Sequence, residues 1–539
     1  MSNLTCWLQS SLSRVYPGSA PKSSDSIDLL AARNERISFQ ACIHNPTESA
    51  AEVEIAVEVP AELGHLVRRV GYVPMPHVNT GTDASEIEGI GHIPGFVPDP
   101  LFPVGPDSDP RTLVGPFETQ SFWITIGSCA GITPGMKEVK VRFTVDEEAL
   151  PEMTARVDIS EVVLQPRRNF PATHWFYADA LCDWYKINLW EERFWELLPA
   201  YVRNMVEHGI NCLYVPIFTP PTDGVKRPTQ LLKVTEPEPG RYEFDFSDVL
   251  RWVKVGEECG AEYFEWTHFI SQWGAQYALR IYRDNLDPES LLWDPETEAV
   301  SNTYRNFLAQ FLPAFKAFLD ENKLMERSFF HVSDEPHGDE HLDNYRRARA
   351  MLKELAPWMR VMDALSDIRY GKEGLTDMPI PSIGAWKAYA EEGIRSWVYY
   401  CCGPRGKYVQ RLMDTPLAKI RMNGWLFYKL DAKGFLHWGH NYWHKSQTQQ
   451  LIDPFTESSG CAWPGWAYGD TFVVYPGSDG PIDSIRWEIF GESMQDYALL
   501  QTVGIKLDDP LLAEIEGYDE FPKCEEWIAR ARRIILKGK

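Results

Sequence analysis

Two patterns of hydrophobic and polar positions follow one another along the chain. Up to about Pro166, apolar and polar residues alternate over short segments bounded by turn residues, as is typical of strands with one buried face. The clearest such segments are residues 36–45, 51–59, 119–127 and 138–146. The pattern predicts an N-terminal β-sandwich domain over residues 1–167. Within it, residues 89–116 are rich in Gly and Pro, and we expect one long ordered loop there.

After Arg167 the pattern changes to short apolar segments that alternate with amphipathic helices. Helices are predicted over residues 192–208, 304–319 and 341–355. Eight segments are predicted to be strands: residues 174–181, 212–218, 261–269, 328–336, 360–365, 382–386, 395–401 and 434–443. This alternation predicts an α/β fold, with a (β/α)8 TIM barrel over residues 168–505 preceded by the N-terminal β-sandwich. A helical tail is expected over residues 506–539.

Charge and cysteine content narrow the class of protein. The 539 residues include 53 Lys and Arg against 77 Asp and Glu, a net charge of −24, which disfavours nucleic-acid and membrane partners. No apolar run approaches about 18 residues, and the N-terminus lacks the basic start and apolar core of a signal peptide. Ten cysteines without a CxxC pair suit a reduced, cytoplasmic protein. Assembly into a homo-oligomer stays open.

Candidate ligand-binding residues follow from the predicted barrel, because active sites of such barrels lie at the C-terminal ends of the strands. The substrate-binding residues expected there are His174, Asp179, Trp273, Asp363, Trp386, Tyr399, Tyr400, Trp438, Asn441 and Trp443. The set is rich in carboxylates and aromatic rings and poor in cations, which favours a neutral sugar over a phosphate. Each aromatic residue could instead pack in the core, and each aspartate could cap a loop.

Two adjacent carboxylates, Asp334 and Glu335, end the fourth predicted strand. Pro336 cannot donate to a sheet, so the strand ends here and both acids lie at the rim. Like charges this close raise the pKa of at least one carboxyl, and a carboxyl that stays protonated near neutral pH can act as a general acid. Neighbouring acids address one side of a sugar, so one protonates the leaving oxygen and the other orients the substrate. The alternative is that the motif caps a helix with an acidic first turn.

A metal site is the second alternative for this region. The segment HWGHNYWH brings His437, His440 and His444 together, and further histidines lie beside the acid pair. However, strand alternation directs His437 and His440 to opposite faces, and the sequence has no HExxH motif. We therefore expect neither a metal nor another cofactor.

Several longer motifs resemble one known family. HVSDEP, WVYYCCGPRGKY, RMNGWLFYKLDAKGFLHWGHNYW, DTFVVYPG and SIRWEIFGESMQDYALL are similar to the domain-of-unknown-function family 4091, the C-terminal part of proteins similar to glycoside hydrolase family 123. VPDPLFP and GPFETQSFWITI resemble the N-terminal sandwich of that family. The resemblance implies a β-N-acetylgalactosaminidase-like activity by substrate-assisted retaining hydrolysis, in which the 2-acetamido group of the sugar attacks its own anomeric carbon. It also implies that Asp334 orients this group and that Glu335 is the acid/base.

A substrate-assisted site also needs supporting residues. Tyr399 or Tyr400 is expected to donate a hydrogen bond to the acetamido oxygen, and only one of them can face inward because side chains alternate along a strand. Trp438 and Trp443 are expected to form walls of the acetyl pocket, and Trp386 to stack beneath the sugar.

Two other functions remain open at this point. One is a glycosidase for sugars without an acetamido group, in which Asp179, Asp183 or Asp363 acts as a separate nucleophile. The other is a carbohydrate-binding protein without catalytic activity.

Overall fold

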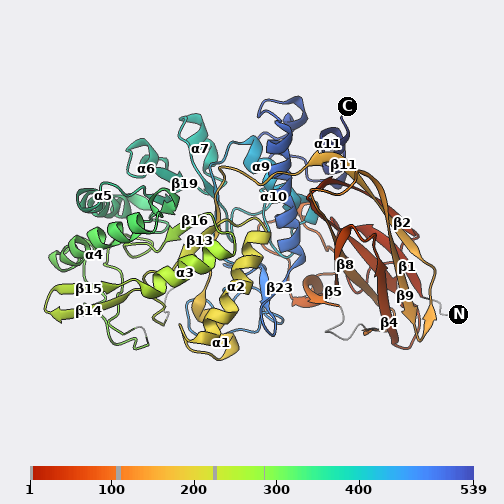
Figure 1. The fold of residues 1–539 in the computed structure, drawn as a ribbon, viewed down its shortest axis with the longest axis horizontal. Coiled ribbons are helices and arrows are strands. Elements are labelled where there is room, and N and C mark those ends of the chain that lie inside the picture. Colours follow the sequence, from red (N-terminus) through yellow and green to blue (C-terminus); the bar gives the residue numbers. More distant parts are fainter. Residues whose placement is uncertain (1–3, 105–110, 222–226, 285, 539) are drawn as a thin grey trace.

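The computed structural model describes residues 4–104, 111–221, 227–284 and 286–538. A β-rich N-terminal part and a larger α/β part lie side by side along the longest axis of the molecule (Figure 1). None of the described helices combines the length and the apolar composition that crossing a bilayer requires.

The N-terminal part consists of two facing sheets, as the alternating pattern predicts. The first sheet has the order β1 (Thr5–Ser10), β3 (Arg36–His44), β8 (Thr119–Ser128), β5 (Leu63–Met75) and β6 (Gly95–Pro103). The second has the order β2 (Ser26–Arg33), β11 (Met153–Val163), β9 (Gly135–Val145), β4 (Ala51–Glu58) and β7 (Arg111–Val114), and β10 (Glu148–Ala149) pairs with β9. Phe39, Phe122 and Phe143 are among the side chains that fill the core.

The expected long loop over residues 89–116 contains two strands, β6 and β7, so that prediction is wrong. Strand β6 has the sequence GFVPDPLFP, whose three prolines are typical of a loop. It lies at the edge of its sheet, where prolines are tolerated, and a single bridge joins its Pro100 to Ser484. The edge position, which the sequence does not reveal, explains the difference.

The α/β part is built on a curled parallel sheet. Six strands have the order β17 (Ser328–Phe329), β16 (Tyr263–Trp266), β13 (Cys212–Val215), β12 (Ala172–His174), β21 (Phe435–His437) and β20 (Val398–Tyr399). Strands β18 (Met362–Ala364) and β19 (Met378–Ile380) form a separate parallel pair. Single parallel bridges join Phe330 to Val361 and Ser382 to Tyr399, and so connect this pair to both ends of the six-stranded sheet.

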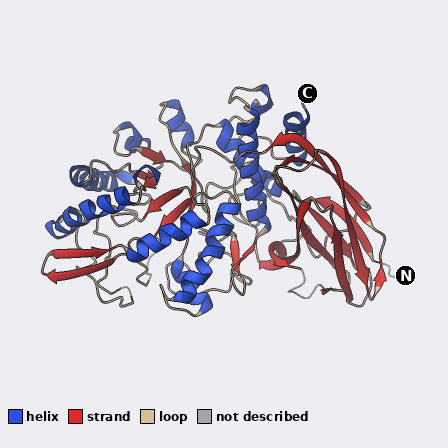
Figure 2. Cartoon of the chain, in the orientation of Figure 1, coloured by secondary structure: helices blue, strands red, loops and turns tan. Residues whose placement is uncertain are grey.

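Helices surround the curled sheet (Figure 2). They are α1 (Ala178–Tyr185), α2 (Glu192–Glu207), α3 (Ser247–Glu258), α4 (Asn302–Glu321), α5 (Gly338–Leu355), α6 (Ile368–Lys372), α7 (Trp386–Glu391), α8 (Leu417–Arg421), α9 (Asn423–Lys429) and α10 (Ile485–Val503). The three helices predicted from periodicity correspond to α2, α4 and α5. In α4, Ser301 caps the N-terminus by accepting from the Tyr304 N–H, and Phe307, Phe311 and Phe315 form the buried face.

Shorter elements complete this part of the chain. The sheet connections contain two hairpins, β14 (Lys233–Glu238) with β15 (Arg241–Asp245) and β22 (Val474–Pro476) with β23 (Pro481–Asp483). Single 3₁₀ turns are η2 (Met325–Arg327) and η3 (Pro510–Leu512), and a third, η1 (Ala84–Glu86), lies in the N-terminal part. The tail expected to be helical over residues 506–539 contains only η3 and α11 (Glu525–Lys537) as helical elements.

The predicted strands are longer than the observed ones. The first was expected over residues 174–181, but β12 ends at His174 and α1 begins at Ala178. The sixth was expected over residues 382–386, but β19 ends at Ile380 and Trp386 begins α7. A short apolar run fits a buried strand and a buried helix equally well, so periodicity alone does not locate these boundaries.

Buried ion pairs join the two parts of the molecule. Asp99 of β6 accepts two hydrogen bonds of 2.9 Å from the guanidinium of Arg486 on α10, and one of 2.6 Å from the Tyr475 hydroxyl. Arg68 of β5 pairs with Asp483 and Glu488 in the same interface. Because Arg68, Asp99, Arg486 and Glu488 are buried, the charge of each depends on its partner.

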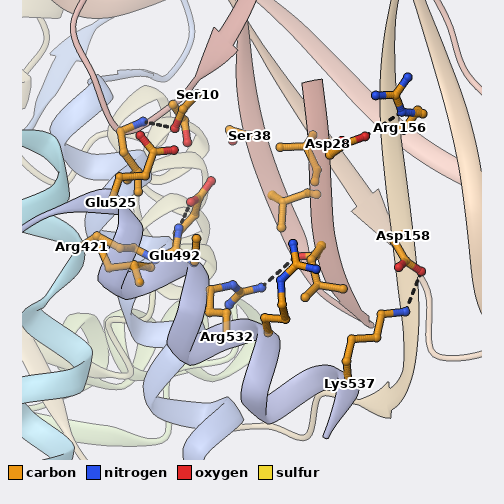
Figure 3. A pocket seen from close by; sticks show the side chains of 18 of the residues that line it. Ser10, Asp28, Ser38, Arg156, Asp158, Arg421, Glu492, Glu525, Arg532 and Lys537 are labelled. Carbon is orange, nitrogen blue, oxygen red and sulfur yellow. Dashed lines mark hydrogen bonds and ion pairs between the residues drawn. The ribbon is translucent and has the colours of Figure 1, made fainter. Parts of the chain in front are cut away.

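Helix α11 returns to the N-terminal part and packs against β2 and β11. Figure 3 shows the cavity of about 390 Å³ between this helix, α10 and the sandwich. On its walls Arg421 pairs with Glu492, and Lys537 pairs with Asp158 at 2.7 Å. The C-terminal helix therefore fastens the α/β part to the sandwich.

Replacing Arg486 with Met should lower the free energy of unfolding by about 3–5 kcal/mol, because Asp99 would remain buried without its cation. Arg156→Met is the matched control, since the ion pair of Arg156 with Asp28 is exposed and should contribute less than about 1 kcal/mol. Denaturant unfolding of both variants measures the difference. Equal losses would show that the buried pair does not hold the interface.

Candidate active site

A cavity of about 130 Å³ opens where the strands of the curled sheet end. Its walls come from segments that follow β12, β16, β17, β18, β20 and β21, and from the long connection between β21 and α10. The lining residues are Trp175, Gln272, Trp273, Asp334, Glu335, Ala364, Tyr399, Cys401, Cys402, Leu436, Trp438, Trp466 and Asp470. Two adjacent acids thus lie in a pocket with four tryptophans.

The acid pair lies on the segment between β17 and α5. Glu335 has a φ of 43°, a left-handed conformation that costs a residue with a Cβ about 1 kcal/mol. The Tyr399 hydroxyl donates a hydrogen bond of 2.5 Å to Glu335 Oε1. Helix α5 begins at Gly338 and its N-cap residue is His337, so the alternative in which the acid pair caps this helix is wrong.

Tyr399 and Tyr400 point in opposite directions, as the alternation along a strand requires. Burial and the neighbouring charge of Glu335 raise the pKa of Tyr399 well above its usual value, so its hydroxyl stays protonated and donates. The Tyr400 hydroxyl instead donates to Asn423 Oδ1 at 3.0 Å, away from the cavity. Of the two, only Tyr399 lines the cavity.

A third carboxyl, Asp470, holds one aromatic wall. The Trp438 Nε1–H donates to Asp470 Oδ2 at 3.0 Å, and the Trp438 ring packs against Trp466 with centroids 5.3 Å apart. His437 Nε2 lies 3.5 Å from Asp470 Oδ1. The Gly439 N–H donates to His437 Nδ1, so the other nitrogen carries the proton of the neutral ring. Burial raises the pKa of Asp470 to about 7.

Beneath the cavity, His331 lies between two buried carboxylates. Its Nε2 is 2.7 Å from Glu265 Oε1 and its Nδ1 is 3.2 Å from Asp363 Oδ1. Burial opposes a charge on this ring, but the hydrogen bonds and charges of Asp363 and Glu265 outweigh it and raise the pKa of His331 to about 10. Glu265 also accepts from the Trp175 indole at 2.9 Å. The three groups Glu265, His331 and Asp363 form a charged layer, and through Glu265 this layer holds Trp175, which forms one wall of the cavity.

His268, His331 and Asp363 lie close enough together to suggest a metal centre. Both ring nitrogens of His331 already have carboxylate partners, Nε2 with Glu265 and Nδ1 with Asp363. In a second cluster, Asp483 and Glu488 already pair with Arg68, and His208 Nε2 lies 3.0 Å from Glu488 Oε1. The donor chemistry of both clusters therefore suits ion pairs rather than a metal.

Five of the predicted site residues line the cavity, and they are Asp334, Glu335, Trp273, Tyr399 and Trp438. The other seven are outside its lining, and they are His174, Asp179, Asp363, Trp386, Tyr400, Asn441 and Trp443.

These seven have structural contacts instead. His174 Nε2 lies 3.2 Å from Arg411 Nη1 in the buried floor, and Asn441 bonds to both the N–H and the carbonyl of Tyr177. Trp443 donates to the Val474 carbonyl. Trp386 packs edge-on against Tyr518, and Asp179 is buried on α1. Asp363 contacts His331 beneath the cavity, so it orients His331 instead of facing a ligand.

The prediction missed several lining residues. Trp175 directly follows β12, but the sequence predicts a strand that continues to residue 181, so Trp175 is not at a predicted strand end. Trp466 and Asp470 lie far beyond β21 in the long connection to α10, where strand position gives no signal. Gln272, which follows β16, had a strand-end signal but was left out of the predicted binding set.

Comparison with known families decides the class of this site. The sequence matches the family described as Glycoside hydrolase 123, catalytic domain, over residues 175–503, which is well over half of the chain. The chain belongs to glycoside hydrolase family 123. It is therefore a glycosidase with a carbohydrate substrate, and the resemblance noted from its motifs is confirmed.

The family 123 fold extends beyond the matched domain. The solved structure of a family 123 glycoside hydrolase from Clostridium perfringens aligns with a TM-score of 0.75 at 14% identity, covering 99% of this chain and 97% of the other. A Bacteroides ovatus GH5 xyloglucanase aligns at 9% identity with a TM-score of 0.32, covering 88% and 98%, and at that score it carries no argument. No curated protein matches the chain.

Tyr399→Phe should lower kcat/KM for an aryl glycoside by about 10- to 100-fold, because a hydrogen bond to a charged group contributes about 1.5–3 kcal/mol. Tyr400→Phe is the matched control, since its hydroxyl faces away from the cavity, and it should change kcat/KM by less than about threefold. Steady-state kinetics of both variants test the assignment. Equal losses would mean that Tyr399 acts only through packing.

Asp470→Asn should gain stability relative to the wild type as the pH rises from 4 to 8. An unfolded aspartate ionises near pH 4, whereas Asp470 in the folded protein holds its proton up to about pH 7. The wild type therefore loses stability over this interval, by about 2–4 kcal/mol, and the neutral variant does not. Asp367→Asn is the control, because hydrogen bonds to Arg369 lower the pKa of its carboxyl, so its stability difference from the wild type should change below about pH 4 and stay nearly constant from pH 4 to 8. Thermal unfolding at several pH values measures both, and a pH-independent difference for Asp470→Asn would contradict the buried protonated carboxyl.

Proposed function

We propose that this family 123 enzyme removes a terminal 2-acetamido sugar, in the manner of a β-N-acetylgalactosaminidase, by substrate-assisted retaining hydrolysis. The observation that carries the proposal is the placing of Asp334 and Glu335 side by side in one aromatic cavity, with Tyr399 bonded to Glu335. Acids on adjacent residues reach one side of a sugar ring. They leave the opposite face to a nucleophile that the substrate supplies itself.

The proposed reaction has two steps. Glu335 donates its proton to the glycosidic oxygen while the acetamido carbonyl oxygen attacks the anomeric carbon, and the bond to the leaving group breaks. Asp334 accepts from the acetamido N–H and stabilises the positive charge of the oxazolinium ion. Glu335, now a carboxylate, takes a proton from water. The water oxygen attacks the anomeric carbon, which opens the oxazolinium ring and gives net retention.

The tryptophans and Tyr399 complete the proposed pocket. Trp438 and Trp466 pack against each other on one wall, and Trp175 is held by Glu265 on another. Such apolar faces suit a methyl group and the C–H face of a pyranose. We assign to Tyr399 a hydrogen bond to the acetamido oxygen when a sugar is bound.

The alternative with a separate carboxylate nucleophile has less support. Asp179, Asp183 and Asp363 do not line the cavity, and Asp183 already pairs with His444 at 2.7 Å and with Arg227 at 2.9 Å. Asp470 does line the cavity, but its Oδ2 accepts from Trp438, and its pKa, raised to about 7 by burial, leaves less of the carboxyl ionised below that pH.

The same proposal includes the architecture around the site. We propose that the eight parallel strands form a closed (β/α)8 barrel, which the bridges Phe330–Val361 and Ser382–Tyr399 support. We also propose the domain limits 1–167, 168–505 and 506–539. The solved relative from Clostridium perfringens is described in terms of glycolipid glycan hydrolysis, so a glycan terminus is the substrate class to test first.

Asp334→Asn and Glu335→Gln should each reduce kcat on chromogenic β-GalNAc or β-GlcNAc substrates by about 10²- to 10⁴-fold, the range typical of acid–base and charge-stabilising groups. Glu340→Gln, an exposed acid in the first turn of α5, is the matched control and should retain activity. A thiazoline that mimics the oxazoline should inhibit the wild type competitively. Full activity in both site variants would overturn the roles, and a 2-fluoro sugar trapped on another carboxylate would favour a non-acetamido substrate.

A further inference from the structure

A second cavity, of about 300 Å³, adjoins the catalytic one. Gln272 and Trp273 line both cavities, so this pair forms the wall between them. The Trp273 side chain is 42% exposed, which is unusual for so large an apolar group. Neither the family match nor the roles proposed for the acid pair give this second cavity a function.

The wall is fixed to the catalytic acids. The Trp273 N–H donates to the Asp334 carbonyl at 2.8 Å, and the Ser333 hydroxyl donates to the Ser271 carbonyl at 2.6 Å. On its other side, the Ser271 and Tyr277 backbones are joined by a hydrogen bond of 3.0 Å, and the Tyr277 N–H also bonds to Ser271 Oγ. The second cavity therefore has a fixed position relative to Glu335.

The chemistry of the second cavity differs from that of the first. Its lining residues include three aromatic residues, Trp273, Tyr277 and Tyr282, together with Gln272 and Arg280. The described lining includes no carboxylate, although the chain as a whole has a net charge of −24. Aromatic faces with a few strong hydrogen-bond donors are the features that recognise the C–H face and the hydroxyls of a sugar.

We propose that this cavity binds the first sugar of the leaving group, on the far side of the bond that Glu335 protonates. The inference rests on the proposed function, because it needs the terminal sugar to occupy the catalytic cavity. An enzyme with two adjoining subsites discriminates between leaving groups. A glycan longer than one sugar uses both cavities, whereas an aryl glycoside of the same sugar fills the first and leaves the contacts to Arg280 unmade.

The test compares the two kinds of substrate in one enzyme. For each protein, kcat/KM is measured on an aryl β-N-acetylhexosaminide and on an oligosaccharide with the same terminal sugar, and the ratio of the two values is taken. Arg280→Met should lower the ratio of oligosaccharide to aryl activity about tenfold, mostly through KM, since it removes a charged hydrogen-bond donor to the leaving sugar. Tyr277→Ala should lower the same ratio.

Arg241→Met is the matched control, because Arg241 lies on strand β15 and lines neither cavity. It should leave the ratio at the wild-type value. An unchanged ratio in both Arg280→Met and Tyr277→Ala, while the wild type cleaves both substrates, would overturn the second subsite alone. Failure of the wild type to cleave either substrate would overturn the proposed function and this inference together.

Discussion

A protonated histidine between two buried carboxylates fixes the floor of the catalytic cavity. Glu265, His331 and Asp363 belong to or directly follow three neighbouring strands, and Thr173 of a fourth strand also donates to Glu265. Burying three ionisable groups costs several kcal/mol for each charge, and their mutual hydrogen bonds, with those from Trp175 and Thr173, offset this cost. The layer therefore tolerates one arrangement of the strand ends. Since Asp334 follows His331 by three residues, the acid pair inherits that fixed position.

The β-sandwich supports the site from the side. Asn79 donates to Asp414 at 2.8 Å and accepts from the Tyr468 N–H at 2.8 Å, close to Trp466 and Asp470 in the chain. Arg486 links Asp99 to the carbonyls of Gly469 and Phe472 on either side of Asp470. The connection that carries the third carboxyl and the Trp466 wall is thus held against the N-terminal part. None of the described residues of the β-rich part lines the cavity, yet its contacts hold the connection that forms one wall.

The sequence was sufficient for the features that depend on local pattern. The β-rich first part and the parallel α/β second part follow from alternation and helical period. The acid pair does follow the fourth strand, but β17 already ends at Phe329, so the prediction that Pro336 stops this strand is wrong. The sequence was insufficient to predict which side chains face the cavity, because that depends on contacts between residues far apart in the chain. Asn441 and Trp443 follow a strand as a ligand-binding residue would, yet they hold Tyr177 and Val474. Asp470 reaches the cavity from a connection without periodicity, and nothing local marks it.

The left-handed backbone at Glu335 has a consequence for the engineering of this enzyme. Glycine adopts that conformation without the steric penalty that a Cβ brings, and asparagine adopts it more readily than glutamate. Replacing the acid at this position would relieve that strain, although the hydrogen bond from Tyr399 would be lost with it. A thermostable library of this protein has to be screened for turnover as well, because its most durable members can be those that no longer react.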